Sequence, residues 1–250
     1  MLDVCDGAGL FQPRRRAVRL IRWTFVSMIV LLAPSTGSCS SLVIEDWSGI
    51  PTGTTGVPSG WHEQGAPAGG DMTVVAEGDI RALHLVSRKN KWFIAKDLRN
   101  TPKDLKSGVD VNQTPILEWS WKVTALPSSG DSRQDATSDY AAALCVSWLR
   151  LPYMIGPLHM CYLWDTVAPV GTIVTSKEYV NLRLIVVRSG TADLGTWVHE
   201  ERDILDDFRR VHGTSPDVVG AIRIGISSAR TRSTAEAWLG TIAFHGRTRP

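Results

Sequence analysis

Ile116-Leu-Glu-Trp-Ser-Trp-Lys-Val123 alternates between apolar and polar residues, and this stretch decides the fold. Leu117, Trp119, Trp121 and Val123 fall on one face, because successive side chains of a β-strand point to opposite sides of a sheet. We therefore expect a strand here, with both tryptophans in the protein core.

Similar alternation recurs along the chain. It is strong over residues 180–187, 218–226 and 235–245, and the last of these segments has Trp238, Ile242 and Phe244 on one face. Weaker candidates cover residues 42–47, 72–76, 82–87, 92–96, 141–148 and 160–164. Short strands joined by loops rich in Gly, Pro, Ser and Thr predict an all-β fold. We expect a jelly-roll-like β-sandwich of two antiparallel sheets.

One segment has a helical pattern instead. Asp203 is placed to cap a helix over residues 204–211, and Gly213 follows its end. Asp206 and Asp207 lie near the start and basic residues lie near the end, which suits the helix dipole. This distribution is typical of a short surface helix and argues against a catalytic role for its carboxylates.

The first 40 residues have the three parts of a secretory signal. Arginines precede the uncharged apolar run from Trp23 to Ala33, and small residues follow it as far as Ser41. That run has 11 residues, whereas a spanning helix needs roughly 20, so an N-terminal membrane anchor is the weaker alternative. We expect residues 1–40 to be a signal peptide and residues 41–250 to form one β-sandwich domain outside the cytoplasm, in the periplasm or at the outer membrane.

The expected cleavage region contains Cys39. Thr36-Gly-Ser-Cys39 resembles the lipobox of bacterial lipoproteins, in which the cysteine becomes the lipidated N-terminus. That pattern usually has Leu where Thr36 stands, and cleavage after Ser40 is the alternative. Lipidation of Cys39 would anchor the protein to a membrane, and both outcomes stay open.

Cys145 and Cys161 remain in the mature part and lie on consecutive predicted strands. An exported protein can join such cysteines in an oxidising compartment, whereas two buried thiols would act as small apolar residues. The sequence is compatible with either state. It contains no Cys/His spacing typical of zinc and no nucleotide-binding glycine pattern, so we expect no metal and no cofactor.

Charge in the expected mature part is balanced. After residue 40 the chain keeps 22 of its 27 basic and 23 of its 25 acidic residues, a net charge of −1. The basic character of the whole chain therefore comes from the leader. No basic patch with interleaved aromatic residues remains, which argues against a nucleic acid partner.

An ordered set of short motifs runs through the domain. The motifs are Trp119-Ser-Trp121, Leu126-Pro127, Asp139-Tyr-Ala141, Tyr162-Leu-Trp164, Val187-Arg-Ser-Gly190, Leu194-Gly-Thr-Trp197, Glu200-Glu-Arg202, Asp207-Phe208, Val219-Gly-Ala-Ile222 and Ala237-Trp-Leu-Gly-Thr-Ile242. In this order they resemble the bacterial family called domain of unknown function 3047, from Leu42 to Arg247. The resemblance implies an exported bacterial protein with a jelly-roll-like sandwich. The family usually has an acidic stretch after the penultimate strand, but residues 227–232 are not acidic, which puts a metal or acid role for that loop in doubt.

Tryptophan makes up 10 of the 19 aromatic residues of the chain. Flat indole faces can stack on sugar rings, with polar side chains holding the hydroxyl groups. Trp61, Trp92 and Trp148 lie near predicted loops or beside polar residues, so we expect them to be exposed and to bind the ligand. The alternative is packing in the core, where β-sandwiches also place tryptophan.

Catalysis of glycoside hydrolysis would need two carboxylates about 5–10 Å apart. The candidates are Glu118, Asp139, Asp165, Glu200 and Glu201, whose separation in space the sequence does not establish. No GxSxG, HExxH or P-loop motif occurs. We therefore expect no catalytic residue.

Three functions are compatible with these observations. The favoured one is an exported cell-envelope module that binds a polysaccharide or cell-envelope glycan without cleaving it, and an exposed aromatic platform would support it. A structural envelope protein without a small ligand would instead show a closed sandwich. A glycoside hydrolase or lyase would show two carboxylates converging in a cleft.

Overall fold

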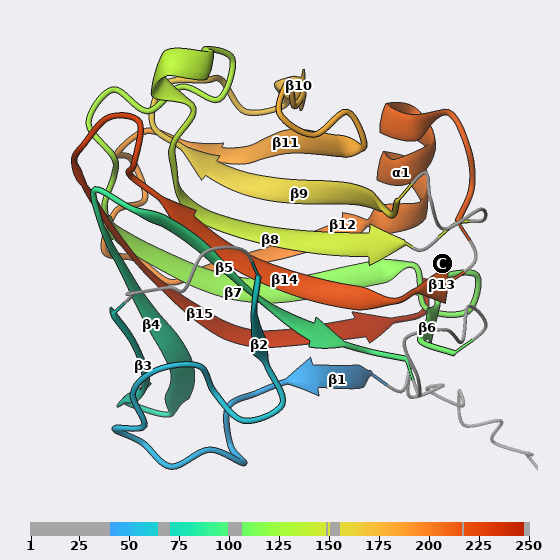
Figure 1. Cartoon of the computed structure of the whole chain (residues 1–250). Helices are drawn as coiled ribbons and strands as arrows, with labels where there is room; N and C mark the ends of the chain where they lie inside the picture. Colours follow the sequence, from blue (N-terminus) through green and yellow to red (C-terminus); the bar gives the residue numbers. More distant parts are fainter. Residues whose placement is uncertain are drawn as a thin grey trace, which may run out of the picture. The chain divides into compact units, whose positions relative to one another are not determined.

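The computed structural model describes residues 41–64, 71–99, 107–148, 150, 156–216 and 218–247. These residues belong to one compact unit, Ser38–Pro250, built mainly of strands (Figure 1). The expected signal peptide, with Cys39, lies outside the described residues. No helix in the described ranges combines the length and the apolar character needed to cross a membrane.

The strands are β1 (Leu42–Glu45), β2 (His62–Gln64), β3 (Asp71–Glu77), β4 (Ile80–Arg88), β5 (Lys91–Asp97), β6 (Val109–Asp110), β7 (Ile116–Ala125), β8 (Tyr140–Trp148), β9 (Leu158–Asp165), β10 (Ile173–Thr175), β11 (Leu182–Ser189), β12 (Val198–Asp203), β13 (Val218–Val219), β14 (Ala221–Ser227) and β15 (Thr234–His245). The helices are the 3-10 helix η1 (Asp135–Thr137) and the α-helix α1 (Ile204–His212). Each strongly alternating segment of the sequence contains a strand. The sequence missed β2, β6, β10 and β12, because the first three are very short and β12 reads Val-His-Glu-Glu-Arg-Asp.

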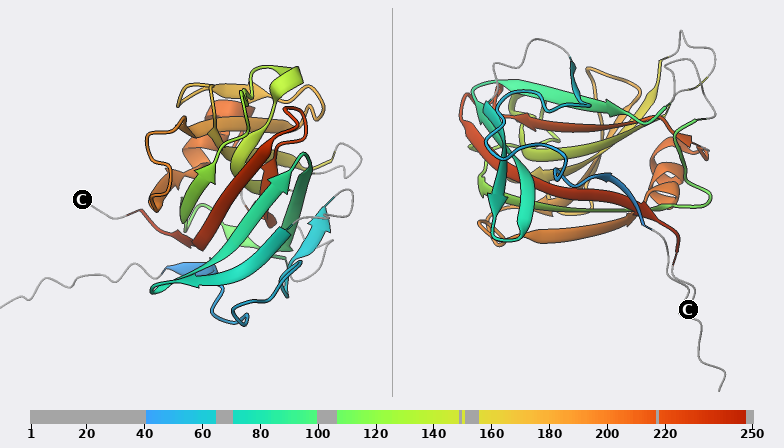
Figure 2. Two further views of the ribbon diagram at one scale, coloured as in Figure 1. Left: turned by 90° about the vertical axis from the view of Figure 1, so that its left-hand side faces the viewer. Right: turned by 90° about the horizontal axis from the view of Figure 1, so that it is seen from below.

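Two sheets stack face to face (Figure 2). One has six strands in the order β12-β7-β15-β4-β3, with β1 added beside β15, and the other has seven in the order β10-β11-β9-β8-β14-β5-β2. The predicted jelly-roll-like β-sandwich is thereby confirmed. One pair, β9 with β11, is parallel and departs from the expected antiparallel pattern. The reason is that the chain first forms β10, antiparallel to β11, before it returns beside β9.

The core between the sheets is rich in aromatic rings. Trp119 and Trp121 point into it from β7, as predicted, with ring centroids 5.4 Å apart. From the opposite sheet, Tyr162 stacks on Trp119 at 5.1 Å and Trp164 packs against Trp121 at 5.8 Å. Such offset and edge contacts add to the stabilisation that comes from burying large apolar surfaces. The sheets are therefore joined by interlocking rings.

The prediction that Trp238 shares a face with Ile242 and Phe244 on the last strand is wrong. Ile242 and Phe244 are buried, but Trp238 lies on the outer face of the six-stranded sheet, where it is half-buried. The register of β15 against β7 shifts between Leu239 and Ile242. Such an irregularity changes which face later side chains occupy, because alternation resumes one residue out of phase.

The predicted helix α1 is confirmed. The Asp203 carboxylate caps it by accepting hydrogen bonds from the backbone amides of Leu205 and Asp206, at 3.1 Å each. Gly213 ends the helix in the left-handed region with φ 69°, a conformation that favours glycine. The helix lies at one end of the two sheets (Figure 2), where Leu205 and Phe208 are buried.

Candidate functional site

A groove with a volume of about 670 Å³ lies on the outer face of the seven-stranded sheet. Residues of β5, β8, β9, β11 and β14 form its floor. Its rim comes from the loop that contains η1 and from the segment Ser176–Tyr179 between β10 and β11, which we call the strap. In Figure 1, the green η1 and the strand β10 both lie above β11, on the side of the sheet where β10 is the edge strand.

Strand alternation places Phe93 and Arg223 on the floor. On β5, Phe93 is half-buried and faces the groove, while its neighbours Trp92 and Ile94 point into the core. On β14, Arg223 likewise faces outward between two buried isoleucines. The Arg223 guanidinium carbon lies 4.9 Å from the centroid of the Phe93 ring, a cation–π contact.

Gly225 makes this arrangement possible. A Cβ atom there would lie 2.2 Å from Cε1 of Phe93, so the ring rests directly on the bare backbone of β14. Phe93 and Gly225 are opposite each other in the register of β5 and β14. Any larger residue at position 225 would displace the ring from the floor.

His159 lines the groove from β9. Its Nδ1 atom lies 2.8 Å from Oγ of Ser147, its register partner on β8. Burial, with Arg223 and His212 nearby, lowers the pKa of His159 to about 4. The imidazole is therefore neutral at physiological pH and presents a hydrogen-bonding ring rather than a charge.

Cys145 and Cys161 are directly opposite each other on β8 and β9, and their sulfur atoms are joined in a disulfide. Their Cα atoms lie 3.9 Å apart, below the range of about 4.4–6.8 Å that is usual for disulfides. Cys145 is also the register partner of Arg223, and Cys161 lines the groove. The cysteine pair thus lies beside Arg223 in the floor.

Ion pairs hold the strap at the rim. Lys177 Nζ lies 2.8 Å from Oδ2 of Asp135 in η1. Glu178 pairs with Arg230, in the loop before β15, and its Oε2 lies 3.8 Å from Nζ of Lys91. Next to them Tyr179 lines the groove with 61% of its surface exposed. The groove thus has aromatic rings on its floor and on its rim.

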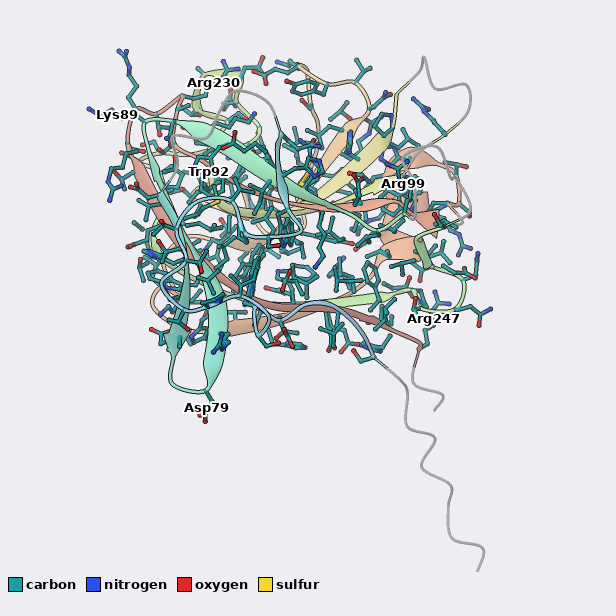
Figure 3. The ribbon with its side chains drawn as sticks, turned by 60° about the horizontal axis from the view of Figure 1, so that its bottom comes forward. Asp79, Lys89, Trp92, Arg99, Arg230 and Arg247 are labelled. Carbon is teal, nitrogen blue, oxygen red and sulfur yellow. A yellow bond between two sulfur atoms is a disulfide. The ribbon has the colours of Figure 1, made fainter. Side chains whose placement is uncertain are left out.

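The expectation that Trp61, Trp92 and Trp148 are exposed is wrong. Their exposed fractions are 7%, 2% and 3%. Figure 3 shows Trp92 within the body of the sandwich, whereas Arg230 lies at its margin. Trp92 points inward because of its place in the alternation of β5, which the polar residues before it obscured. None of the three indoles presents a face on which a sugar could stack.

Loops and the helix bury the other two indoles. Trp61 stacks on Trp47 at 5.6 Å and donates its Nε1 hydrogen to Glu45, at 2.9 Å. Trp148 ends β8, and Phe208 of α1 packs against it with centroids 4.3 Å apart. Position near a loop or at a strand end therefore did not predict exposure.

Among the described residues, the half-buried indoles are those of Trp238 and Trp197. They lie on the outer face of the six-stranded sheet, where neighbouring side chains already contact them. Trp238 lies in register between His84 on β4 and Lys122 on β7. The His84 ring stacks on it at 4.3 Å, and Lys122 Nζ lies 4.3 Å from its centroid. Trp197 donates its Nε1 hydrogen to Glu77, which also pairs with Lys122.

The carboxylates considered for catalysis do not converge in the groove, although Glu118 and Glu201 are register partners on β7 and β12. Asp139 accepts hydrogen bonds from Ser227 and Thr231, and Asp165 accepts them from three backbone amides, so both organise loops. Glu200 pairs with an arginine, while Glu118 and Glu201 lie outside the groove. The carboxylates that do line the groove, Asp135 and Glu178, are those of the rim ion pairs. Within the described ranges, no cluster of His, Cys, Asp and Glu is suited to hold a metal.

Phe93, Arg223 and Tyr179 are not among the site residues predicted from the sequence. The alternation Ile222-Arg-Ile224 does signal an outward arginine, and Trp92-Phe-Ile94 signals an outward ring. No sequence signal brought these two strands together or placed the strap beside them. The groove therefore became visible only in the fold.

Comparison with solved structures found several proteins with a similar fold. The family 30 carbohydrate-binding module of a cellulosomal cellulase from Clostridium thermocellum matches with 11% identity and a TM-score of 0.41, over 84% of this chain and 99% of that one. Endoglucanase 3 of family GH12 from Trichoderma harzianum matches with 10% identity and a TM-score of 0.39, over 84% and 96%. At these scores the likenesses carry no argument about function.

Comparison with curated proteins found no match. The model of one protein family matches residues 59–243, which is most of the chain and most of the described β-sandwich. The chain belongs to the family described as protein of unknown function DUF3047.

Proposed function

We propose that this protein is an exported module that binds a polysaccharide or cell-envelope glycan, without cleaving it, in the groove of the seven-stranded sheet. The observation that carries the proposal is the open groove of about 670 Å³, which has an aromatic ring on its floor and another on its rim. Grooves of this size suit a few sugar units, whose apolar ring faces stack on aromatic side chains.

The polar lining of the groove supports the same function. Neutral His159, Arg223 and Gln64 face it alongside Phe93 and Tyr179. Such groups can donate or accept hydrogen bonds with sugar hydroxyls, which fix the orientation of a stacked ring. Of the tryptophans that we first considered, Trp61 and Trp148 do not line the groove, and Trp92 lines it but is only 2% exposed.

The state of the carboxylates supports binding rather than cleavage. Asp135 and Glu178 at the rim are held by Lys177, Arg230 and Lys91. Glycoside hydrolysis needs two carboxyl groups free to act on the glycosidic bond, whereas both rim carboxylates are engaged in ion pairs. Export remains part of the proposal on the strength of the leader, and mass spectrometry of the N-terminus would test it and distinguish lipidated Cys39 from cleavage after Ser40.

Affinity electrophoresis against a panel of soluble polysaccharides tests the binding site. Phe93→Ala and Tyr179→Ala should weaken retardation because each removes one stacking ring. A single site should bind oligosaccharides with a Kd on the order of micromolar to millimolar, tightened on a polymer by repeated contacts. The matched control is Trp197→Ala, which removes a half-buried ring from the other sheet and should leave retardation unchanged.

Three results would overturn the proposal. Loss of binding in Trp197→Ala, with Phe93→Ala and Tyr179→Ala unaffected, would move the site to the six-stranded sheet. Absence of binding to every polysaccharide would favour the structural envelope protein. Release of reducing ends from a bound polymer would instead show an enzyme.

A further inference from the structure

Arg223 is a cation on the groove floor that has no anionic partner among the described residues. It is half-buried, and none of the hydrogen bonds or ion pairs found among the described residues involves it. Its Nε atom is buried and has no acceptor. The Phe93 ring, 4.9 Å from the guanidinium carbon, compensates only partly for the hydration that the guanidinium loses, because a cation–π contact accepts no hydrogen bond.

Other half-buried arginines of the described residues have acceptors, which are carboxylates for Arg188 and Arg202 and backbone carbonyls for Arg81 and Arg183. Arg188 Nε lies 2.6 Å from Glu200, and Arg202 Nη2 lies 2.8 Å from Asp207. Both arginine side chains have the same exposed fraction, 33%, and both carboxylates are nearly buried. Removing a cation from water is costly unless an anion or acceptor replaces the lost hydration. Arg223 therefore lacks, among the described residues, the acceptor that the other half-buried arginines have. An anionic ligand would supply it.

The surroundings of Arg223 are positive. Five basic residues line the groove (Lys91, Arg133, Lys177, Arg223 and Arg230) against two acidic ones (Asp135 and Glu178); Arg133 pairs with Asp131, which leaves an excess of two positive charges. Burial, with Arg230 and Arg223 nearby, lowers the pKa of Lys91. A groove with one sign of charge raises the local concentration of ligands of the opposite sign.

We propose that the groove binds an acidic saccharide and that Arg223 holds the carboxylate of a uronic acid residue. This inference rests on the proposed function. The planar guanidinium donates two parallel hydrogen bonds that match the two oxygens of a carboxylate. Phe93 and Tyr179 supply rings for the sugar faces beside it. A neutral glycan would leave the charge of Arg223 unmatched.

Isothermal titration with matched oligosaccharides tests the inference. The probes are tetramers of galacturonate, glucuronate and mannuronate, each beside the same tetramer with its carboxylates reduced to alcohols. At least one acidic tetramer should bind about tenfold or more tightly than its reduced form, since a hydrogen bond to a charged group contributes roughly 1.5–3 kcal/mol. High salt should diminish this preference.

Variants assign the preference to Arg223. Arg223→Gln should abolish it, so that the acidic tetramer and its reduced form bind with equal affinity. Arg209→Gln is the matched control, because Arg209 lies on α1 outside the groove and should leave the preference intact. If Arg223→Gln fails to fold, Arg223→Lys keeps the charge but not the two-pronged geometry, and should lose most of the preference.

The possible failures are distinguishable. Equal affinity for all acidic and reduced tetramers would overturn the inference and leave the proposed function standing. A preference that survives in Arg223→Gln and Arg223→Lys would likewise overturn it. Tighter binding of dextran sulfate, or of a single-stranded oligonucleotide, than of any uronate would assign the groove to another anion. Absence of binding by every probe and every polysaccharide would overturn both proposals.

Discussion

The two outer faces of the sandwich use the same residue types in different ways. On the six-stranded sheet, His84, Trp238 and Lys122 form a continuous row in which ring and cation contact each other. On the seven-stranded sheet, Phe93 and Arg223 also form a ring–cation pair, but a groove lies above them. The two faces differ because the polar groups of the first row contact one another, whereas Arg223 has no acceptor among the residues that the structure describes.

This contrast shows why counting tryptophans misplaces the site. Trp238 is covered by neighbours on both adjacent strands, so its indole stabilises the sheet. Phe93 and Tyr179 are less conspicuous in the sequence, but they line the open groove. An aromatic side chain serves binding only where the fold leaves it room.

The largest expected effect on stability comes from replacing Trp92 on β5, whose neighbour Phe93 points to the opposite face of the sheet. Trp92→Ala should lower the free energy of unfolding by about 3–5 kcal/mol, as for an emptied core site. Phe93→Ala should cost at most about 2 kcal/mol, because its ring is half-buried over the groove. Urea denaturation measures both. Equal losses for the two variants would contradict the assignment of opposite faces.

The next largest effect on stability is expected from the cysteine pair, which lies in the groove floor on the seven-stranded sheet. Replacing Cys145 and Cys161 together by Ala should lower the free energy of unfolding by at most about 3 kcal/mol, because the closed loop is short. Denaturation with and without reductant measures it, and the double variant should no longer respond to reductant. If the wild-type protein purified under oxidising conditions carries two free thiols by mass spectrometry, the disulfide is absent.

Substitution of Trp238, on the outer face of the six-stranded sheet, should change stability but not glycan binding. Trp238→Ala removes the stack with His84 and the contact with Lys122, which together contribute about 2 kcal/mol. Binding in the groove should not change, because Trp238 lies on the opposite sheet. Thermal unfolding and affinity electrophoresis measure the two effects. Loss of glycan binding at unchanged stability would reverse the roles of the two faces.

The smallest expected effect is the pH dependence from His159. Burial lowers its pKa to about 4, so below the ordinary value near 6.5 the unfolded chain binds a proton that the folded chain does not. Stability should therefore be full above pH 6.5 and fall toward pH 4, by at most about 2 kcal/mol at pH 5. His159→Asn should flatten this part of the profile in denaturation experiments. An unchanged slope would show that His159 is solvated in the folded protein.

The same low pKa affects the groove. His159 stays uncharged from neutral pH down to about pH 5, so it adds no charge that would change the affinity for an acidic glycan in that range. The charge there comes from arginines and lysines, which stay protonated at these pH values.

The longer strands and the helix follow from the sequence alone. The period of two in residues 116–123 placed Trp119 and Trp121 inside, since a strand with one apolar face must bury it. Asp203 and Gly213 determined the ends of α1, because a cap acts on amides and carbonyls within a few residues of it. These features depend on local geometry, which a single segment carries with it.

Only the tertiary structure decided which surfaces are open. Trp61 and Trp148 became buried because a distant loop and α1 pack on them, and Trp238 changed face through a register shift in β15. The groove requires β5, β14 and the strap together, which are far apart in the sequence. Arg223 lacks an anion because of what surrounds it, and no pattern within one strand records its neighbours across the sheet.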